Sequence, residues 1–195
     1  MSQAMREALI RPSAISANVE ILRAMAGTPN MLIVVKANGY GHGALTAARA
    51  ALEGGATWLG TADIQEALEL RAGGVRAPIL AWLFGPGEDL TGAYEAGIDL
   101  GVSSVAQLEQ VLSVVKPGAP ARLHLKVDSG LGRNGADPRD WEALFTRAKQ
   151  AQDARLVRTI GIFTHLSGTS VQADAAQGEV YDQALSLASS HGIVP

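Results

Sequence analysis

The residue best suited to covalent chemistry in this sequence is a lysine that directly follows an apolar stretch. Met31 to Val35 are all apolar and lead into Lys36, and a glycine-rich turn with Tyr40 and His42 follows. Burying an ammonium group is costly and favours the neutral amine, which can attack a carbonyl carbon. The stretch fits either a Schiff-base lysine at the end of a strand or a lysine whose long stem reaches back to water.

Composition narrows the class of protein that could carry such a lysine. At 195 residues, with 47% hydrophobic and 18% charged residues, the chain can bury one substantial core and is typical of a soluble globular domain. Its 16 basic and 19 acidic residues form no block of one sign, which argues against nucleic-acid or anionic-membrane binding. A small molecule is therefore the expected partner.

The chain also lacks several features that would indicate another compartment. It has no cysteine, so neither disulfides nor thiolate chemistry are expected. Its first residues lack the apolar region of a signal peptide, and no apolar run approaches the ~20 residues that cross a bilayer. We expect a cytoplasmic protein without a metal site.

Apolar periodicity and turn residues predict strands that alternate with helices. Strands are expected at residues 31–36, 57–61, 78–84, 98–102, 122–128 and 156–164. Helices are expected at residues 13–27, 44–52, 63–72, from 86–88 through 94, 104–115, from 138, and 174–190.

Several helix ends have recognisable capping residues. Ser13 can cap the first helix and Gly27 can end it, while Asp63 with Glu66 forms a plausible capping box. Asp137 is a suitable cap for the helix that starts at residue 138.

Six strands alternating with helices imply parallel pairing, either in a doubly wound sheet or in part of a (β/α)8 barrel. Both architectures place functional residues at the carboxyl ends of the strands. Lys36, Asp128, Arg133 and His165 all lie at or just after such ends, so we expect them on one rim of the sheet. This placement favours the Schiff-base interpretation of Lys36.

Four segments resemble motifs of the alanine racemase family: VVKANGYGHG at 34–43, WLGTADIQEALELRAGG at 58–74, LKVDSGLGRNG at 125–135 and FTHLSG at 163–168. The resemblance implies an incomplete (β/α)8 barrel of the TIM type with about six β/α units. It also implies that residues 1–195 form a single N-terminal domain that binds pyridoxal 5'-phosphate (PLP), truncated before the last strands and a C-terminal β domain.

The resemblance also implies roles for individual residues. Lys36 looks like the lysine that forms a Schiff base with PLP and moves the substrate proton on one face. Tyr40 is similar to a tyrosine that holds the cofactor phosphate, Arg133 to an arginine that donates to the phenolic oxygen, and His165 to a histidine that packs on the ring. Taken alone, these residues also fit a turn tyrosine, a solvated loop arginine and a rim histidine.

Strand 122–128 carries a further candidate. His124, Lys126 and Asp128 have the same parity and should point to one side of the sheet. Lys126 corresponds to a position that some family members carbamylate, which would give Arg133 an anionic partner. After His165 the chain departs from the family, because residues 167–170 contain no acidic side chain.

The resemblance implies PLP-dependent interconversion of L- and D-alanine, which supplies D-alanine for bacterial peptidoglycan. A homodimer is expected for the full-length enzyme, whereas the 195 residues alone are expected to be inactive and able to self-associate. The alternatives are a non-catalytic PLP-binding domain and a PLP-carrier protein.

Overall fold

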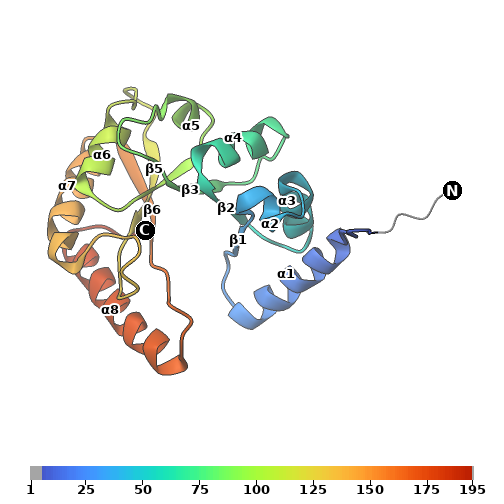
Figure 1. The fold of residues 1–195 in the computed structure, drawn as a ribbon. Coiled ribbons are helices and arrows are strands. Elements are labelled where there is room, and N and C mark those ends of the chain that lie inside the picture. Colours follow the sequence, from blue (N-terminus) through green and yellow to red (C-terminus); the bar gives the residue numbers. More distant parts are fainter. Residues whose placement is uncertain (1–5, 195) are drawn as a thin grey trace. The chain divides into compact units, whose positions relative to one another are not determined.

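The computed structural model describes residues 6–194, and in it six strands alternate with helices along the chain (Figure 1). The expected alternation is therefore confirmed. The chain divides into two compact units, one up to Ile79 and the other from Leu80 onwards. The boundary falls inside the third strand.

The first unit contains two parallel strands and four helices. Its elements are α1 (Pro12–Ala26), β1 (Leu32–Val34), α2 (Lys36–Tyr40), α3 (Ala44–Glu53), β2 (Trp58–Asp63) and α4 (Ile64–Ala72). Helix α1 packs against α3, where Ser16 Oγ donates a hydrogen bond of 2.9 Å to the carbonyl oxygen of Ala50. A Cβ atom at Gly54 would lie 2.4 Å from the Ser16 carbonyl oxygen, so this close approach requires glycine.

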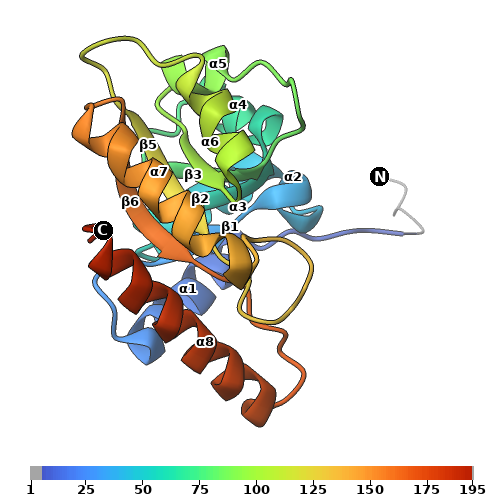
Figure 2. The same ribbon diagram turned by 90° about the vertical axis from the view of Figure 1, so that its left-hand side faces the viewer.

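The second unit contains a parallel sheet in the order β3, β4, β5, β6. Its elements are β3 (Ile79–Leu83), which begins at the boundary, α5 (Thr91–Glu95), β4 (Asp99–Val102), α6 (Val105–Leu112), β5 (Ala121–Lys126), a 3-10 helix (Pro138–Asp140), α7 (Trp141–Asp153), β6 (Val157–Phe163) and α8 (Val171–Ser190). Helix α7 packs on β6 and against α6 (Figure 2).

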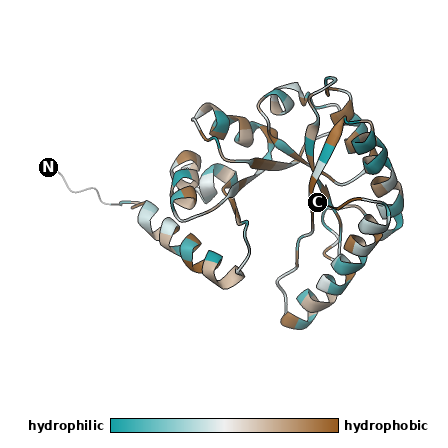
Figure 3. Ribbon diagram, turned by 180° about the vertical axis from the view of Figure 1, so that it is seen from behind, coloured by the Kyte–Doolittle hydropathy of each residue, from teal (hydrophilic) through white to brown (hydrophobic). Residues whose placement is uncertain are grey.

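The core of the second unit comes from the strands and from one face of each covering helix. Fully buried side chains include Leu100, Val102, Leu108, Leu123, Leu125, Leu144 and Phe145. Helix α8 carries hydrophilic and hydrophobic residues interspersed along its length, as expected for a helix with one solvated face (Figure 3). Helices on strands thus produce the layered core that the apolar pattern predicts.

Several helix starts differ from the sequence prediction; α8, for example, begins at Val171 rather than at residue 174. Ser13 lies inside α1, whose N-cap is Arg11 with Pro12 at the first helical position, although Gly27 does end this helix in a left-handed conformation. Helix α5 begins at Thr91 rather than at residues 86–88, because the Glu88 carboxylate accepts the Gly85 N–H and closes a turn there. Pro86, at the start of the predicted helix, therefore belongs to a turn and does not begin a helix.

Candidate functional site

Lys36 lies at the carboxyl end of β1, as the sequence predicts, although the strand ends two residues earlier at Val34. Val35 is buried, and its N–H donates a hydrogen bond of 2.8 Å to the carbonyl oxygen of Gly60 in β2. Lys36 follows with a partly buried side chain. We call residues 36–43 the lysine turn.

The lysine turn has an unusual backbone. Ala37, Asn38 and Gly39 have φ of 52° to 63° and ψ of 38° to 51°, and Tyr40 continues with φ of 54°. This is a left-handed turn, which costs roughly 1–2 kcal/mol for each L-residue. Position 39 favours glycine for its positive φ and also for lack of space, because a Cβ atom there would lie 2.8 Å from the Cβ atom of Ala47. The residues just after Lys36 are therefore strained.

Side chains within the turn help to hold it. Asn38 Oδ1 accepts the N–H of Ala44 at 2.8 Å, at the first residue of α3, and Asn tolerates the left-handed region better than most residues. His42 Nδ1 lies 2.8 Å from the Gly39 carbonyl oxygen, which makes Nδ1 the donor. His42 thus has a structural role.

The predicted capping box at α4 is half formed. Asp63 accepts the N–H of Glu66 at 2.9 Å, as expected. The Glu66 carboxylate does not return to Asp63; it accepts the N–H of Ala62 at 3.0 Å and the N–H of Ala37 in the lysine turn. The sequence pattern identified Glu66 but assigned it the wrong partner.

Tyr40 lies beside Lys36 within the first unit. The Lys36 Nζ atom is 6.0 Å from the centroid of the Tyr40 ring, at the outer range of a cation–π contact. Tyr40 is 58% exposed, so its hydroxyl is accessible to a ligand.

In the second unit, Lys126 is the last residue of β5 and is only 4% exposed. Its Nζ atom lies 5.6 Å from the centroid of the Phe163 ring, and the His124 ring meets the same phenyl group edge-on at 6.4 Å. The predicted common side of His124 and Lys126 is confirmed. Asp128 lies beyond the strand, where its Oδ1 accepts the N–H groups of Gly130 and Gly132.

Arg133 and His165 are exposed residues on two loops that touch. Arg133 belongs to the arginine loop, residues 129–135 after β5, and His165 to the histidine loop, residues 164–170 after β6. Ser129 Oγ and Thr164 Oγ1 are 2.8 Å apart and join the two loops. Both predicted side chains therefore follow neighbouring strand ends in this unit.

The histidine loop does meet an acidic side chain, but from helix α8. Asp174 Oδ1 accepts the N–H of Gly168 at 2.8 Å, and Gln177 Oε1 accepts the N–H of Ser167 at 2.8 Å. Further along α8, the Tyr181 hydroxyl donates to the carbonyl oxygen of Ile162, and burial raises the pKa of Tyr181. The first half of α8 thus holds the loop that carries His165.

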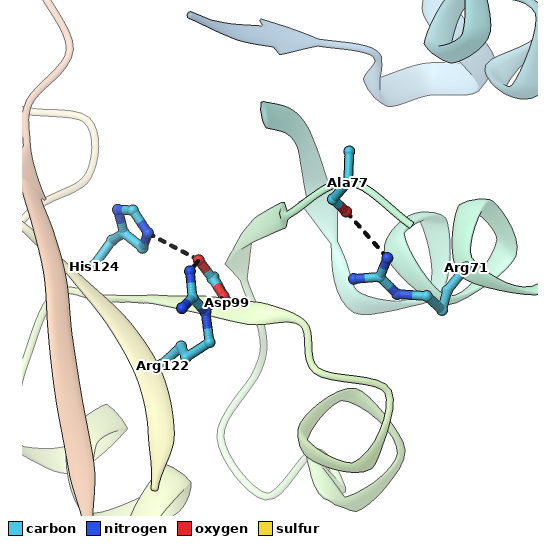
Figure 4. Close-up of polar contacts among 5 residues, drawn as sticks. All are labelled: Arg71, Ala77, Asp99, Arg122 and His124. Atoms are coloured by element: carbon cyan, nitrogen blue, oxygen red, sulfur yellow. Dashed lines mark hydrogen bonds and ion pairs between the residues drawn. The ribbon is translucent and has the colours of Figure 1, made fainter. Parts of the chain in front are cut away.

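A buried charge cluster that the sequence did not predict lies on β4 and β5. Asp99 is fully buried and accepts hydrogen bonds from Nε and Nη2 of Arg122, and its Oδ2 lies 3.1 Å from His124 Nε2 (Figure 4). The fork of the guanidinium matches the carboxylate. His124 therefore connects this cluster to the Phe163 ring that Lys126 also contacts.

The described residues offer neither a metal-binding cluster nor a membrane-spanning helix. Within residues 6–194, no three histidine, aspartate or glutamate side chains gather in a way that could hold a metal ion. Nor does any helix in that range combine the length and apolar character needed to cross a membrane.

These observations define a parallel α/β protein with a lysine, an arginine and a histidine placed just after strand ends. The chain belongs to the alanine racemase N-terminal domain family, whose model matches residues 10–195.

Similar proteins support this assignment over nearly the whole chain. The alanine racemase of Thermobifida fusca is 49% identical over 97% of this chain and 52% of that protein. The structures of alanine racemases from Streptomyces lavendulae and Streptomyces coelicolor A3(2) are 41% and 40% identical, each with a TM-score of 0.91, and align with 95% of this chain and 50% and 51% of theirs. The expected α/β fold, six units of a (β/α)8-type barrel, is thus confirmed. The chain spans about half the length of the curated relatives it matches.

Proposed function

We propose that this chain is the cofactor-binding half of a PLP-dependent alanine racemase, an isomerase that interconverts L- and D-alanine in the cytoplasm and supplies D-alanine for peptidoglycan. The observation that carries the proposal is Lys36, partly buried at the carboxyl end of β1 and followed by a left-handed turn. The names of its relatives supply the reaction.

The chemistry of the available groups fits PLP. Lys36 offers a primary amine for the cofactor aldehyde, and the Tyr40 ring lies 6.0 Å from it with an exposed hydroxyl that can donate to a phosphate. From the resemblance to the family we assign Arg133 to the phenolic oxygen and His165 to the ring. Both residues are exposed, and the loops that carry them are joined by the contact between Ser129 and Thr164. When bound, PLP supplies the electron sink that stabilises a carbanion at the substrate α-carbon.

Lys36 is the general base and acid on one face of the substrate. Its amine takes the α-proton from one enantiomer and returns a proton to the same face in the reverse direction. Racemisation needs a second group for the opposite face, and we infer that the longer enzyme, expected as a homodimer, provides it. The isolated 195 residues would then bind the cofactor without turnover.

We also propose that Lys126 is carbamylated. Its side chain is almost fully buried, and a carbamate would be an anion able to accept two hydrogen bonds from Arg133. Carbon-13 NMR of the folded chain in ¹³C-bicarbonate buffer should show a carbamate resonance that is absent in the variant Lys126→Arg. An unmodified ammonium group under those conditions contradicts this assignment.

Borohydride reduction in the presence of PLP, followed by peptide mapping, tests the proposed function. We expect a pyridoxyl group on Lys36 and none at residue 36 in the variant Lys36→Arg, which keeps the charge but cannot condense with an aldehyde. Equal labelling of exposed lysines such as Lys116, without preference for Lys36, would overturn the proposal.

A second candidate function is a non-catalytic PLP-binding or PLP-carrier protein, in which the partly buried Lys36 would hold the cofactor without a group for the opposite substrate face. Assay of D-alanine formation by the 195-residue chain separates the two ideas. Labelling of Lys36 without turnover supports cofactor binding alone in this half, whereas sustained turnover shows that both proton-transfer groups are present.

A further inference from the structure

We propose that Glu66 is a positioning residue for Lys36, because its carboxylate fastens the strained turn that follows the lysine to strand β2. The inference rests on the proposed function in that it takes Lys36 to be the reacting amine. The inference adds a role for Glu66, a residue of α4 whose carboxylate would not itself bind the cofactor.

Each oxygen of the Glu66 carboxylate has a backbone partner on a different element. Oε2 accepts the N–H of Ala62 in β2 at 3.0 Å, and Oε1 accepts the N–H of Ala37, the residue directly after Lys36. Glu66 is partly buried, so water screens these bonds less than it would on an open surface. One carboxylate therefore ties the peptide after the lysine to the neighbouring strand.

The lysine turn needs such a tie because its own backbone resists the conformation. Ala37 and Asn38 are L-residues in the left-handed region, where a carbonyl oxygen approaches the Cβ atom too closely. Strained backbone persists only where surrounding contacts over-determine it. The hydrogen bond to Glu66 is made by Ala37, the first residue in the left-handed region. It therefore stabilises the backbone conformation directly after Lys36, which sets the direction of the Lys36 side chain.

A role limited to capping α4 does not account for this geometry. In a capping box, the third helical residue returns to the N–H of the cap, which here would be Asp63. Glu66 bonds to Ala62 and Ala37 instead, while the Asp63 side chain caps the helix by accepting the Glu66 N–H. The helix start thus has its own cap, and the Glu66 carboxylate serves the turn.

Glutamate is the residue type that this position requires. The two bonds need two acceptor oxygens, whereas glutamine offers one oxygen and an NH₂ group that would face a donor. Aspartate keeps both oxygens but is one methylene shorter. The variant Glu66→Gln therefore breaks one bond with little change in volume.

The experiment compares the full chain with Glu66→Gln and with Glu69→Gln, one turn further along α4, whose carboxylate accepts from Gln65 and not from the lysine turn. In Glu66→Gln we expect the Ala37 amide to exchange hydrogen at least roughly tenfold faster, and PLP to label Lys36 roughly tenfold more slowly, as loss of a charged hydrogen bond implies. Glu69→Gln should match the unaltered chain in both measurements.

The double variant Glu66→Gln with Ala37→Gly distinguishes positioning from a general loss of stability. Glycine adopts the left-handed region without strain, so Lys36 labelling should recover while the amide of residue 37 still exchanges fast. Loss of α4 stability alone would not be rescued in this way, and the double variant also remains informative if Glu66→Gln folds poorly.

The outcomes separate the two ideas. Unchanged exchange at Ala37 in Glu66→Gln, equal effects of Glu69→Gln, or no recovery in the double variant would overturn the role of Glu66. Failure of the unaltered chain to label Lys36 would overturn the proposed function instead, and the exchange data would still decide whether Glu66 holds the turn.

Discussion

The lysine turn and the arginine loop both follow parallel strands and both carry a residue proposed to bind the cofactor, yet they are held by different means. The lysine turn places three L-residues at positive φ, and a carboxylate 29 residues away bonds to it. The arginine loop reaches positive φ at Gly130, Gly132 and Gly135, and Asp128 at its own start accepts two of its N–H groups.

This difference indicates that the fold restricts the backbone of the lysine turn more than the backbone of the arginine loop. A local loop of glycines around one aspartate can form from neighbouring residues, whereas the lysine turn is also tied to α4 and β2 through Glu66. Covalent chemistry and proton transfer need close alignment of the reacting atoms, while a hydrogen-bond donor such as Arg133 tolerates more variation. We infer that backbone strain is concentrated next to Lys36 because this residue needs the most exact orientation.

Among substitutions in the two segments, we expect Gly135→Ala in the arginine loop to reduce the free energy of unfolding most. A Cβ atom there would lie 2.5 Å from the backbone of Val127 and Asp128, at a φ of 131°, so we expect a loss of about 3 to 5 kcal/mol in the free energy of unfolding. Urea unfolding followed by circular dichroism measures it. Gly132→Ala is the matched control, because its φ is 72° with no atom within 4 Å, and should cost only about 1 kcal/mol. Equal losses would show that close approach does not govern this loop.

In the lysine turn, Asn38→Ala should cost about 1 to 2 kcal/mol in unfolding free energy. The substitution removes the acceptor of the Ala44 N–H and the residue type that tolerates a positive φ of 54°. The control Asn38→Asp keeps both properties and should lose clearly less in the same urea titration. If both variants lose equally, the turn is held by Glu66 without help from Asn38.

Much of the fold could be predicted because the signals are local. Apolar runs, glycines and caps such as Asp63 specify where elements begin and end, and Asp63 accepts the N–H of Glu66 as the capping box predicts. Lys36 could be singled out because a charged residue after an apolar strand is unusual wherever it occurs.

The remaining features depend on contacts between distant residues. The residues around Ala37 do not predict its left-handed conformation. The carboxylate that accepts the Ala37 N–H belongs to Glu66, which lies on another helix, α4. Asp99 is likewise an ordinary residue at the start of a strand until β5 places Arg122 and His124 beside it. Register and long-range pairing decide these sites, and no single segment encodes them.

Ala37→Gly makes the lysine turn resemble the arginine loop and should stabilise the chain by about 0.5 to 1 kcal/mol. Relief of about 1–2 kcal/mol of left-handed strain outweighs the extra freedom that glycine gives the unfolded chain. Urea unfolding provides the value, and Ala48→Gly in the middle of α3 is the control, which should be destabilising. Destabilisation by Ala37→Gly would mean that the turn is not strained.

The smallest effect concerns Asp137, just after the arginine loop, whose carboxylate pairs locally with Arg139 two residues away. The Arg139 side chain and N–H lower the Asp137 pKa to about 2 from 3.8. Because the folded pKa is depressed, this contribution to stability is present above pH 3.8 and is lost as the pH falls through about 2. Asp137→Asn keeps a capping oxygen, so its stability difference from the unaltered chain isolates the charge.

That difference should be small, because both partners are exposed, and should disappear between about pH 4 and pH 2 and at high salt. Urea titrations of the two chains across this pH range measure it, and in an Arg139→Gln background the difference should shrink at every pH. A difference that persists below pH 2 would show that Asp137 acts through packing or capping geometry. In either case Asp137 acts on a residue two positions away, whereas Glu66 acts on Ala37 across 29 residues, so the support after the arginine loop is local.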